Sequence, residues 1–225
     1  MWRRFFALLG LLAAVLLARP TPQAPLAPVA TISPSPSPVA SPAPIQSTLV
    51  DVQQVAPSIR LDMRYASTNN FVKRQLYPVA KCLLRPEVAQ QLAKVQADLE
   101  KQSLGLLMLD CYRPLSAQKA LWEIKPDPNY VADPSRGSNH NRAAAVDLTL
   151  VDKSGVPLEM PTEFDDFSPR AHPPDHPGAS PVAISNSRTL RDAMTVHGFT
   201  PNSTEWWHFD GVNARSFDVL DLPLH

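Results

Sequence analysis

The stretch SNHNRAAAVDLTLV, residues 138–151, joins a polar segment that contains a histidine to a run with strict alternation. Every second residue of that run is apolar: Val146, Leu148 and Leu150. Side chains of a β-strand alternate between its two faces, so these residues would share one buried face. Residues 146–151 therefore predict a strand inside the core.

Two residues of this stretch have side chains that bind metals. His140 and Asp147 are seven positions apart, so on one unbroken strand they would point to opposite faces. A turn over residues 141–144 would let both side chains face a single point. The spacing therefore predicts a turn followed by a strand, with a polar site where they meet.

Helical and extended patterns are interspersed on both sides of this stretch. Helices are expected at 86–101, 116–124 and 186–197, and strands at 104–109, at 206–209 and once or twice within 49–64. Most gaps between these segments are too short for regular βαβ crossovers. The predicted fold class is therefore α+β, a single domain with a central, mainly antiparallel sheet packed by helices and a site in a cleft.

The first 45 residues differ from the rest in composition. Two arginines precede an apolar run that ends before Arg19, which is typical of an export signal and too short to span a membrane. Residues 1–19 are therefore expected to be a signal peptide or, if uncleaved, an N-terminal anchor. Residues 20–45 are rich in Pro, Ser and Ala, which predicts a disordered linker. The folded domain is expected at 46–225, exported to the periplasm or cell envelope.

Composition also limits the partners. The chain has 225 residues, 44% of them hydrophobic, which is enough apolar material to bury a core. Its 21 Lys and Arg residues balance 21 Asp and Glu residues. Binding to nucleic acid requires a basic surface, so this balance argues against such a partner. Contact with a membrane is expected only through the N-terminal segment, and the oligomeric state stays open.

The chain has two cysteines, Cys82 and Cys111. An exported protein meets oxidising conditions, under which one disulfide is possible. A buried pair of free thiols fits the sequence equally well.

Two further clusters carry groups suited to hydrolysis. Two histidines and one carboxylate can bind zinc and leave a fourth position for water. In the segment EWWH, Glu205 lies three residues before His208, so the histidine could bind the ion while the glutamate takes a proton from the water. Arg113, in the segment DCYRP, could stabilise a developing oxyanion. The two tryptophans between Glu205 and His208 are by default core residues.

Together these clusters resemble the D-Ala-D-Ala dipeptidase family, the VanX-type zinc peptidases. The resemblance rests on Ser-x-His, on an Asp seven residues after that His, and on Glu-x-x-His near the C-terminus. It extends in order over about residues 51–222 through the following segments: RYA at 64–66, NNF at 69–71, LY at 76–77, CLLR at 82–85, DCYRP at 110–114, VDLTL at 146–150, MPTEFD at 160–165 and EWWHF at 205–209.

The resemblance implies a role for each matching residue. His140, Asp147 and His208 match the ligands of one zinc ion per chain. Glu205 matches the base that activates water and later protonates the leaving amine, and Arg113 matches the residue that stabilises the tetrahedral intermediate.

The same resemblance implies how substrate is held. Tyr65 and Asp165 match groups that bind the free ammonium of the substrate, and Ser138 matches a residue that contacts the substrate. Two positions depart from the family pattern, because Ala143 and Pro161 stand where the family usually has Gly. If the backbone at 143 has a positive φ, alanine adds strain there. These departures bear on substrate selection more than on the metal chemistry.

The expected function is therefore zinc-dependent hydrolysis of D-Ala-D-Ala to two D-Ala in cell-wall peptide turnover. One alternative is a D,D-carboxypeptidase or endopeptidase acting on peptidoglycan stem peptides. Another, of a different class, is a non-catalytic module that binds the cell wall. Asp165 discriminates the first two, because a pocket closed at the amine favours a dipeptide and an open groove favours a longer stem. The histidines at 172 and 176 are expected to be loop residues, and His197 to end a helix.

Overall fold

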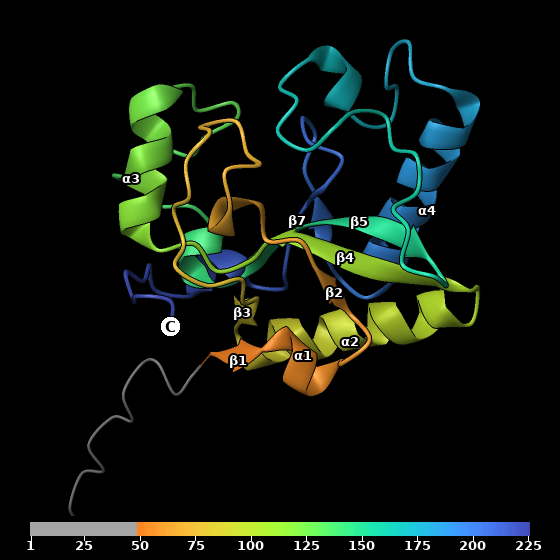
Figure 1. The fold of residues 1–225 in the computed structure, drawn as a ribbon, viewed down its shortest axis with the longest axis horizontal. Coiled ribbons are helices and arrows are strands. Elements are labelled where there is room, and N and C mark those ends of the chain that lie inside the picture. The colour runs from red at the N-terminus through yellow and green to blue at the C-terminus, as the bar shows by residue number, and fades with distance from the viewer. Residues whose placement is uncertain (1–48) are drawn as a thin grey trace, which may run out of the picture. The chain divides into compact units, whose positions relative to one another are not determined.

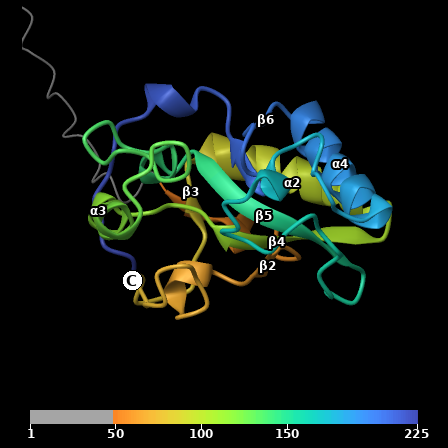
Figure 2. The ribbon, with the colours of Figure 1, turned by 90° about the horizontal axis from the view of Figure 1, so that it is seen from above.

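A computed structural model describes residues 49–225, and the expected signal segment and linker lie outside these residues. The centre of the fold is a five-stranded sheet with the order β2-β4-β5-β7-β6 (Figure 1; β6 is labelled in Figure 2). Its strands are β2 (Arg60–Leu61), β4 (Leu104–Asp110), β5 (Ala145–Asp152), β6 (Thr200–Pro201) and β7 (His208–Asp210). Strands β2 and β4 pair in parallel and all other neighbours are antiparallel. The predicted α+β class with a mainly antiparallel sheet is confirmed.

Residues 49–225 contain four α-helices. They are α1 (Val52–Val55), α2 (Pro86–Glu100), α3 (Leu115–Ile124) and α4 (Pro181–Val196). Helices α2 and α4 contact each other, and they pack against β4 and β5 respectively (Figure 2). Helix α3 lies apart from them, beyond the end of β4 (Figure 1). A small second sheet pairs β1 (Val50–Asp51) with β3 (Leu83–Leu84).

Apolar burial explains these positions. Nearly every residue of β4 and β5 is buried, as expected for central strands covered on both faces. Helix α2 begins with Pro86 at its first turn, where the missing N–H costs nothing. Its predicted apolar stripe is fully buried: Val88, Leu92, Val95 and Leu99. Within residues 49–225, no helix is both long enough and apolar enough to span a bilayer.

The structure also corrects some of the expected boundaries. Helix α4 begins at Pro181, five residues before the predicted start, because Ser180 caps it through a bond from the Ala183 amide to the Ser180 hydroxyl. Strand β7 begins at His208, two residues later than predicted. Between residues 49 and 64, two short strands flank a single helical turn. Strands β3 and β6 were not predicted, since Leu83–Leu84 and Thr200–Pro201 have no alternating apolar pattern.

Candidate active site

Three acidic or basic residues lie side by side across the centre of the sheet. Asp110 ends β4 and pairs in register with Asp147 of β5, which in turn pairs with His208 of β7. Residues opposite one another on neighbouring strands have close side chains. The sheet register therefore brings together groups that are 98 residues apart at most in the chain.

The predicted turn brings His140 to the same point. Residues His140–Arg142 form one 3₁₀ turn, and Ala143 then reverses the chain with a left-handed φ of 56° before β5 begins. Asn141 is fully buried and ties this turn to the segment after β4, because its Nδ2 donates to the Arg113 carbonyl at 2.7 Å. The prediction that a turn would let His140 and Asp147 face one point is confirmed.

The atoms of these side chains form a compact triangle. His140 Nε2 lies 3.2 Å from His208 Nδ1 and 3.3 Å from Asp147 Oδ1, and His208 Nδ1 lies 3.0 Å from Asp147 Oδ1. Bonds of about 2.0–2.2 Å to one ion at tetrahedral angles would separate ligand atoms by about 3.3 Å. Among residues 49–225 this is the group whose donor atoms converge closely enough to hold a metal ion.

The outer nitrogens of both imidazoles are already engaged. His140 Nδ1 lies 2.8 Å from the Cys111 carbonyl oxygen, and His208 Nε2 lies 3.1 Å from Asp210 Oδ1. With a metal ion bound, each outer nitrogen would carry the N–H and donate it to its acceptor, and the inner nitrogens would be left to bind the ion. Histidines that bind metals are oriented in this way. The donor set therefore fits a metal ion that accepts two nitrogens and one carboxylate oxygen.

The electrostatics of the triangle also favour a cation. Burial opposes ionisation of Asp147, but the two neighbouring histidines outweigh it and hold the pKa of its carboxyl well below the usual range. Burial likewise opposes a charge on His208, yet the carboxylates of Asp147 and Asp210 raise its pKa well above the ordinary value. Positive charge is thus stabilised where the three donors meet.

Glu205 lies three residues before His208, in the segment leading into β7. Its side chain is buried, and its Oε2 accepts a hydrogen bond of 3.0 Å from Asn202 Nδ2. Burial is the main reason that the pKa of Glu205 is raised to about 7, and the nearby Asp147 charge adds to the effect. A carboxyl with such a pKa can both accept and donate a proton near neutral pH.

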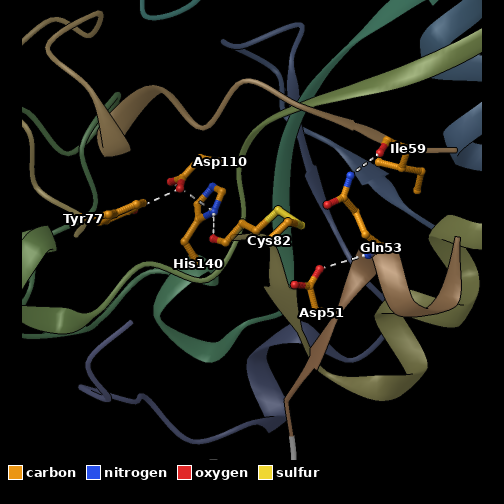
Figure 3. Close-up of a disulfide and its surroundings, with 8 residues drawn as sticks. Asp51, Gln53, Ile59, Tyr77, Cys82, Asp110 and His140 are labelled. Atoms are coloured by element: carbon orange, nitrogen blue, oxygen red, sulfur yellow. Dashed lines mark hydrogen bonds and ion pairs between the residues drawn. A yellow bond between two sulfur atoms is a disulfide. The ribbon is translucent and has the colours of Figure 1, made fainter. Parts of the chain in front are cut away.

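Arg113 is buried and held by three hydrogen bonds to two side chains. Its Nε and Nη2 donate to Asp110 Oδ2 at 2.9 and 2.6 Å, and its Nη1 donates to Gln118 Oε1 at 2.8 Å. The other oxygen of Asp110 accepts from the Tyr77 hydroxyl at 2.9 Å, so Asp110 lies between Tyr77 and the site (Figure 3). Arg113 Nη2 also lies 3.8 Å from Asp147 Oδ2, which places its charge beside the metal-binding group.

Asp165 and Tyr65 meet although they are 100 residues apart in the chain. The Tyr65 hydroxyl lies 3.2 Å from both carboxylate oxygens of Asp165. Burial, with a further contribution from Asp147, raises the pKa of Asp165 well above its usual value. Ser138 is also buried nearby, where its hydroxyl accepts a hydrogen bond from the His140 amide at 3.2 Å. Part of the role of Ser138 is thus to shape the turn.

One cavity of about 920 Å³ connects the residues of the candidate site. The eight residues predicted to form the site all line it: Tyr65, Arg113, Ser138, His140, Asp147, Asp165, Glu205 and His208. The predicted cleft is therefore present and contains the whole candidate site.

The sequence patterns predicted no role for four residues near the site: Asp110, Tyr77, Gln118 and Asp210. Two of them carried a recognisable signal. Asp110 lies three residues before Arg113, and Asp210 lies two residues after His208, so on a strand it shares that face. Tyr77 and Gln118 reach the site only through the tertiary fold and left no such signal.

His176 and His197 have hydrogen-bond partners away from the triangle. His176 is buried between the Arg170 carbonyl and the Ser187 hydroxyl, at 2.9 and 2.8 Å, and so joins the loop before α4 to that helix. His197 caps the end of α4, as predicted, and bonds Asp98 Oδ2 at 2.8 Å.

Cys82 and Cys111 form a disulfide between the residue just before β3 and the segment that follows β4 (Figure 3). Cys111 has two roles, because its sulfur forms the disulfide and its carbonyl oxygen orients His140. The cross-link thus lies directly behind the metal-binding group.

Metal-dependent peptidases divide their work between a cation, a carboxylate that handles protons and a group that balances the oxyanion. The cleft contains a carboxylate, Glu205, and a cationic group, Arg113, beside a set of donor atoms that could bind the metal ion. The fold and site therefore define a metallopeptidase.

Sequence comparison narrows this class. Residues 46–221 match the D-ala-D-ala dipeptidase family of M15 peptidases, and the chain belongs to that family. It is 40% identical over 172 residues to D-alanyl-D-alanine dipeptidase of Escherichia coli (strain K12), covering 76% of this chain and 89% of that relative. It is 30% identical over 179 residues to the protein of the same name from Enterococcus faecium, covering 70% of this chain and 88% of that relative.

Proposed function

We propose that the chain hydrolyses D-Ala-D-Ala to two molecules of D-Ala with one bound zinc ion, in the turnover of cell-wall peptides. The observation that carries this proposal is the triangle of His140, Asp147 and His208 donor atoms, 3.0–3.3 Å apart. Two nitrogens and one oxygen in a site with an open fourth position suit catalytic zinc. Zinc bound there would polarise the scissile carbonyl and lower the pKa of a coordinated water.

The side chains of the cleft would divide the remaining work. Glu205 takes the proton from the attacking water and passes it to the leaving amine, from a buried position three residues before His208. Arg113 is held in place by Asp110 and stabilises the negative charge on the former carbonyl oxygen. Asp165 and Tyr65 hold the free ammonium of the substrate. Ser138, which lies beside the turn, also contacts the substrate.

We also propose that the protein acts outside the cytoplasm, in the periplasm or cell envelope. Two features support this. The N-terminal 19 residues have the composition of an export signal, and disulfides such as Cys82–Cys111 persist mainly in oxidising compartments.

The test is an incubation of the full chain, loaded with one equivalent of zinc, with D-Ala-D-Ala and separately with a pentapeptide stem ending in D-Ala-D-Ala. We expect release of D-Ala from the dipeptide, and none after Glu205→Ala. Release from the pentapeptide alone would instead assign the chain to the carboxypeptidases. No release from either peptide, with zinc bound, would show that the substrate is wrong.

Metal content provides an independent test. His208→Ala should bring the zinc bound per chain from one to near zero after dialysis, as measured by atomic absorption. His197→Ala is the matched control, because this histidine caps α4 and bonds Asp98 instead of facing the triangle. Equal zinc in the wild type and His208→Ala would contradict the assigned ligands.

A further inference from the structure

Three half-buried aromatic residues from three different loops meet at one wall of the cavity. Phe71 comes from the loop before β3, Tyr130 from the loop after α3, and Phe167 from the loop before α4. The Phe71 and Phe167 rings pack edge-to-face with centroids 5.3 Å apart, and the Tyr130 and Phe167 rings lie 5.0 Å apart. All three line the cavity. We call this group the aromatic clasp.

The aromatic clasp is tied to the two residues proposed to hold the substrate amine. Phe167 follows Asp165 by two positions, and the Phe71 ring packs against the Tyr65 ring with centroids 6.4 Å apart. The Tyr65 hydroxyl in turn contacts Asp165 at 3.2 Å. These four residues therefore form a closed circuit around the amine position, and two of its members belong to the clasp.

A cation braces the clasp. Lys125 Nζ lies 4.9 Å from the ring centroids of both Tyr130 and Phe167, within the range of cation–π attraction. The same ammonium lies 4.0 Å from Asp127 Oδ2, which keeps it at the end of α3. The loop after α3 is thus attached to the loop that carries Asp165.

A dipeptide and a longer peptide differ at this wall. The dipeptide ends in an ammonium, which Asp165 can pair. A longer peptide has a neutral amide at that position and another residue beyond it. If Asp165 and Tyr65 mark the amine position, that residue would extend toward the cavity wall lined by Phe71 and Phe167. Rejection by steric exclusion is effective when the obstructing side chains are packed against one another.

We infer that the aromatic clasp of Phe71, Tyr130 and Phe167 is the barrier that restricts this enzyme to dipeptides, whose free amine belongs to the residue just before the C-terminal one. The inference rests on the proposed function and assigns its substrate selectivity to particular residues. Asp165 selects the charge of the amine, and the clasp limits the length of the peptide. Residues that set length in this way are separable by mutation from those that perform the hydrolysis.

The experiment compares kcat/KM of the zinc-loaded full chain for D-Ala-D-Ala and for L-Lys-D-Ala-D-Ala, with release of D-Ala as the measurement. Phe167→Ala and Phe71→Ala should each raise the ratio of tripeptide to dipeptide at least about tenfold, since a gap of several methylenes in a pocket is worth that much discrimination. Both side chains are half-buried, so thermal unfolding is used to verify that each variant is folded.

Two controls sharpen the result. Phe167→Tyr keeps the ring and should return the ratio toward the wild-type value. Val182→Ala, at a position that is 57% exposed on α4, should leave it unchanged. Folded Phe167→Ala and Phe71→Ala variants with the wild-type ratio would overturn the inference, as would a wild type that cleaves both peptides equally. Dipeptide cleavage by the wild type tests the proposed function separately. Its absence would contradict both the proposed function and the inference about the aromatic clasp.

Discussion

The imidazole of His140 is oriented by the backbone of Cys111. His140 Nδ1 donates to the Cys111 carbonyl at 2.8 Å, and Cys111 is joined to Cys82 by a disulfide. Asp110 precedes Cys111 and Arg113 follows two residues later. A cross-link outside the cavity thus fixes the segment that carries three elements of the site: the carbonyl that orients His140, the guanidinium of Arg113 and the carboxylate that holds it.

Removing the disulfide should therefore affect both stability and metal binding. The two cysteines are 29 residues apart. A disulfide that closes a loop of this length lowers the entropy of the unfolded chain, which stabilises the folded state by roughly 3–4 kcal/mol. We expect the Cys82→Ala/Cys111→Ala double variant to lose about that much unfolding free energy in urea titrations. Its zinc affinity should fall roughly 10- to 100-fold, as when the residues that orient metal ligands are changed.

Reduction provides the control for this prediction. A reductant that does not chelate metals should bring the wild type to the stability of the double variant and leave the double variant itself unchanged. If zinc affinity stayed at the wild-type value in both, the link between the disulfide and His140 would be refuted.

Asp110 should matter for turnover although it is not expected to touch the substrate. It is fully buried and contacts Arg113 through Nε and Nη2. Asp110→Asn removes the charge that holds the guanidinium, and breaking one side of a buried pair costs about 3–5 kcal/mol of stability. We expect kcat to fall roughly 10- to 100-fold, less than the 10²–10³-fold expected for Arg113→Ala.

Metal content distinguishes a misplaced Arg113 side chain from a damaged fold. If only the position of Arg113 changes, Asp110→Asn should still bind one zinc per chain. Asp98→Asn is the matched control. It makes the same chemical change in an exposed ion pair with Lys101, where such pairs contribute about 1 kcal/mol or less. A normal kcat in folded Asp110→Asn would show that Arg113 needs no such support.

Glu205 should reduce the stability of the metal-free chain at alkaline pH. Its pKa is raised from an ordinary 4.5 to about 7 in the fold. The folded state therefore binds more protons than the unfolded state between these values, and stability falls as the pH rises through that window. Glu205→Gln removes the charge without changing the shape. The variant should be more stable than the wild type at pH 8 by up to about 3 kcal/mol, with no difference near pH 4.

Urea titrations of the chelator-treated proteins at both pH values test this. The zinc-loaded variant should have no activity, because the base is lost while the metal ligands remain. A variant less stable than the wild type at pH 8 would mean that the Glu205 carboxylate is stabilised by its partners and does not have a raised pKa.

Asp165 should determine affinity for the amine and leave the chemical step largely intact. A hydrogen bond to a charged group contributes about 1.5–3 kcal/mol, so Asp165→Asn should raise KM for D-Ala-D-Ala roughly 10- to 100-fold with a smaller change in kcat. N-acetyl-D-Ala-D-Ala has no ammonium to lose and serves as the comparison substrate. A variant that lost kcat and kept KM would place Asp165 in the chemistry instead.

Much of this arrangement could be predicted from short patterns. Alternation identified β5, helical spacing identified α2, and the seven-residue interval between His140 and Asp147 required the turn that the structure contains. These features are local, since each depends on a few consecutive residues. The parallel pairing of β2 with β4 and the position of Asp110 opposite Asp147 are not local.

Groups that depend on tertiary contacts escaped prediction. Tyr77 meets Asp110 across 33 positions, and the clasp residues Phe71, Tyr130 and Phe167 lie on separate loops. Each of these aromatic residues alone is consistent with an ordinary core position. Their shared role emerges only because the sheet register and the loop lengths place them at one cavity.

Ala143 shows how a departure from the family pattern can be tested by itself. It has a φ of 56°, a left-handed conformation that disfavours residues with a Cβ, and it follows the turn that carries His140. Ala143→Gly relieves this strain but loses a buried methyl group and adds freedom to the unfolded chain. We expect these effects nearly to cancel, with a change of less than about 1 kcal/mol in urea titrations. The adjacent Ala144 is equally buried and has no positive φ, so Ala144→Gly should cost about 1 kcal/mol or more. Equal losses at both positions would show that the left-handed turn at 143 carries no appreciable strain.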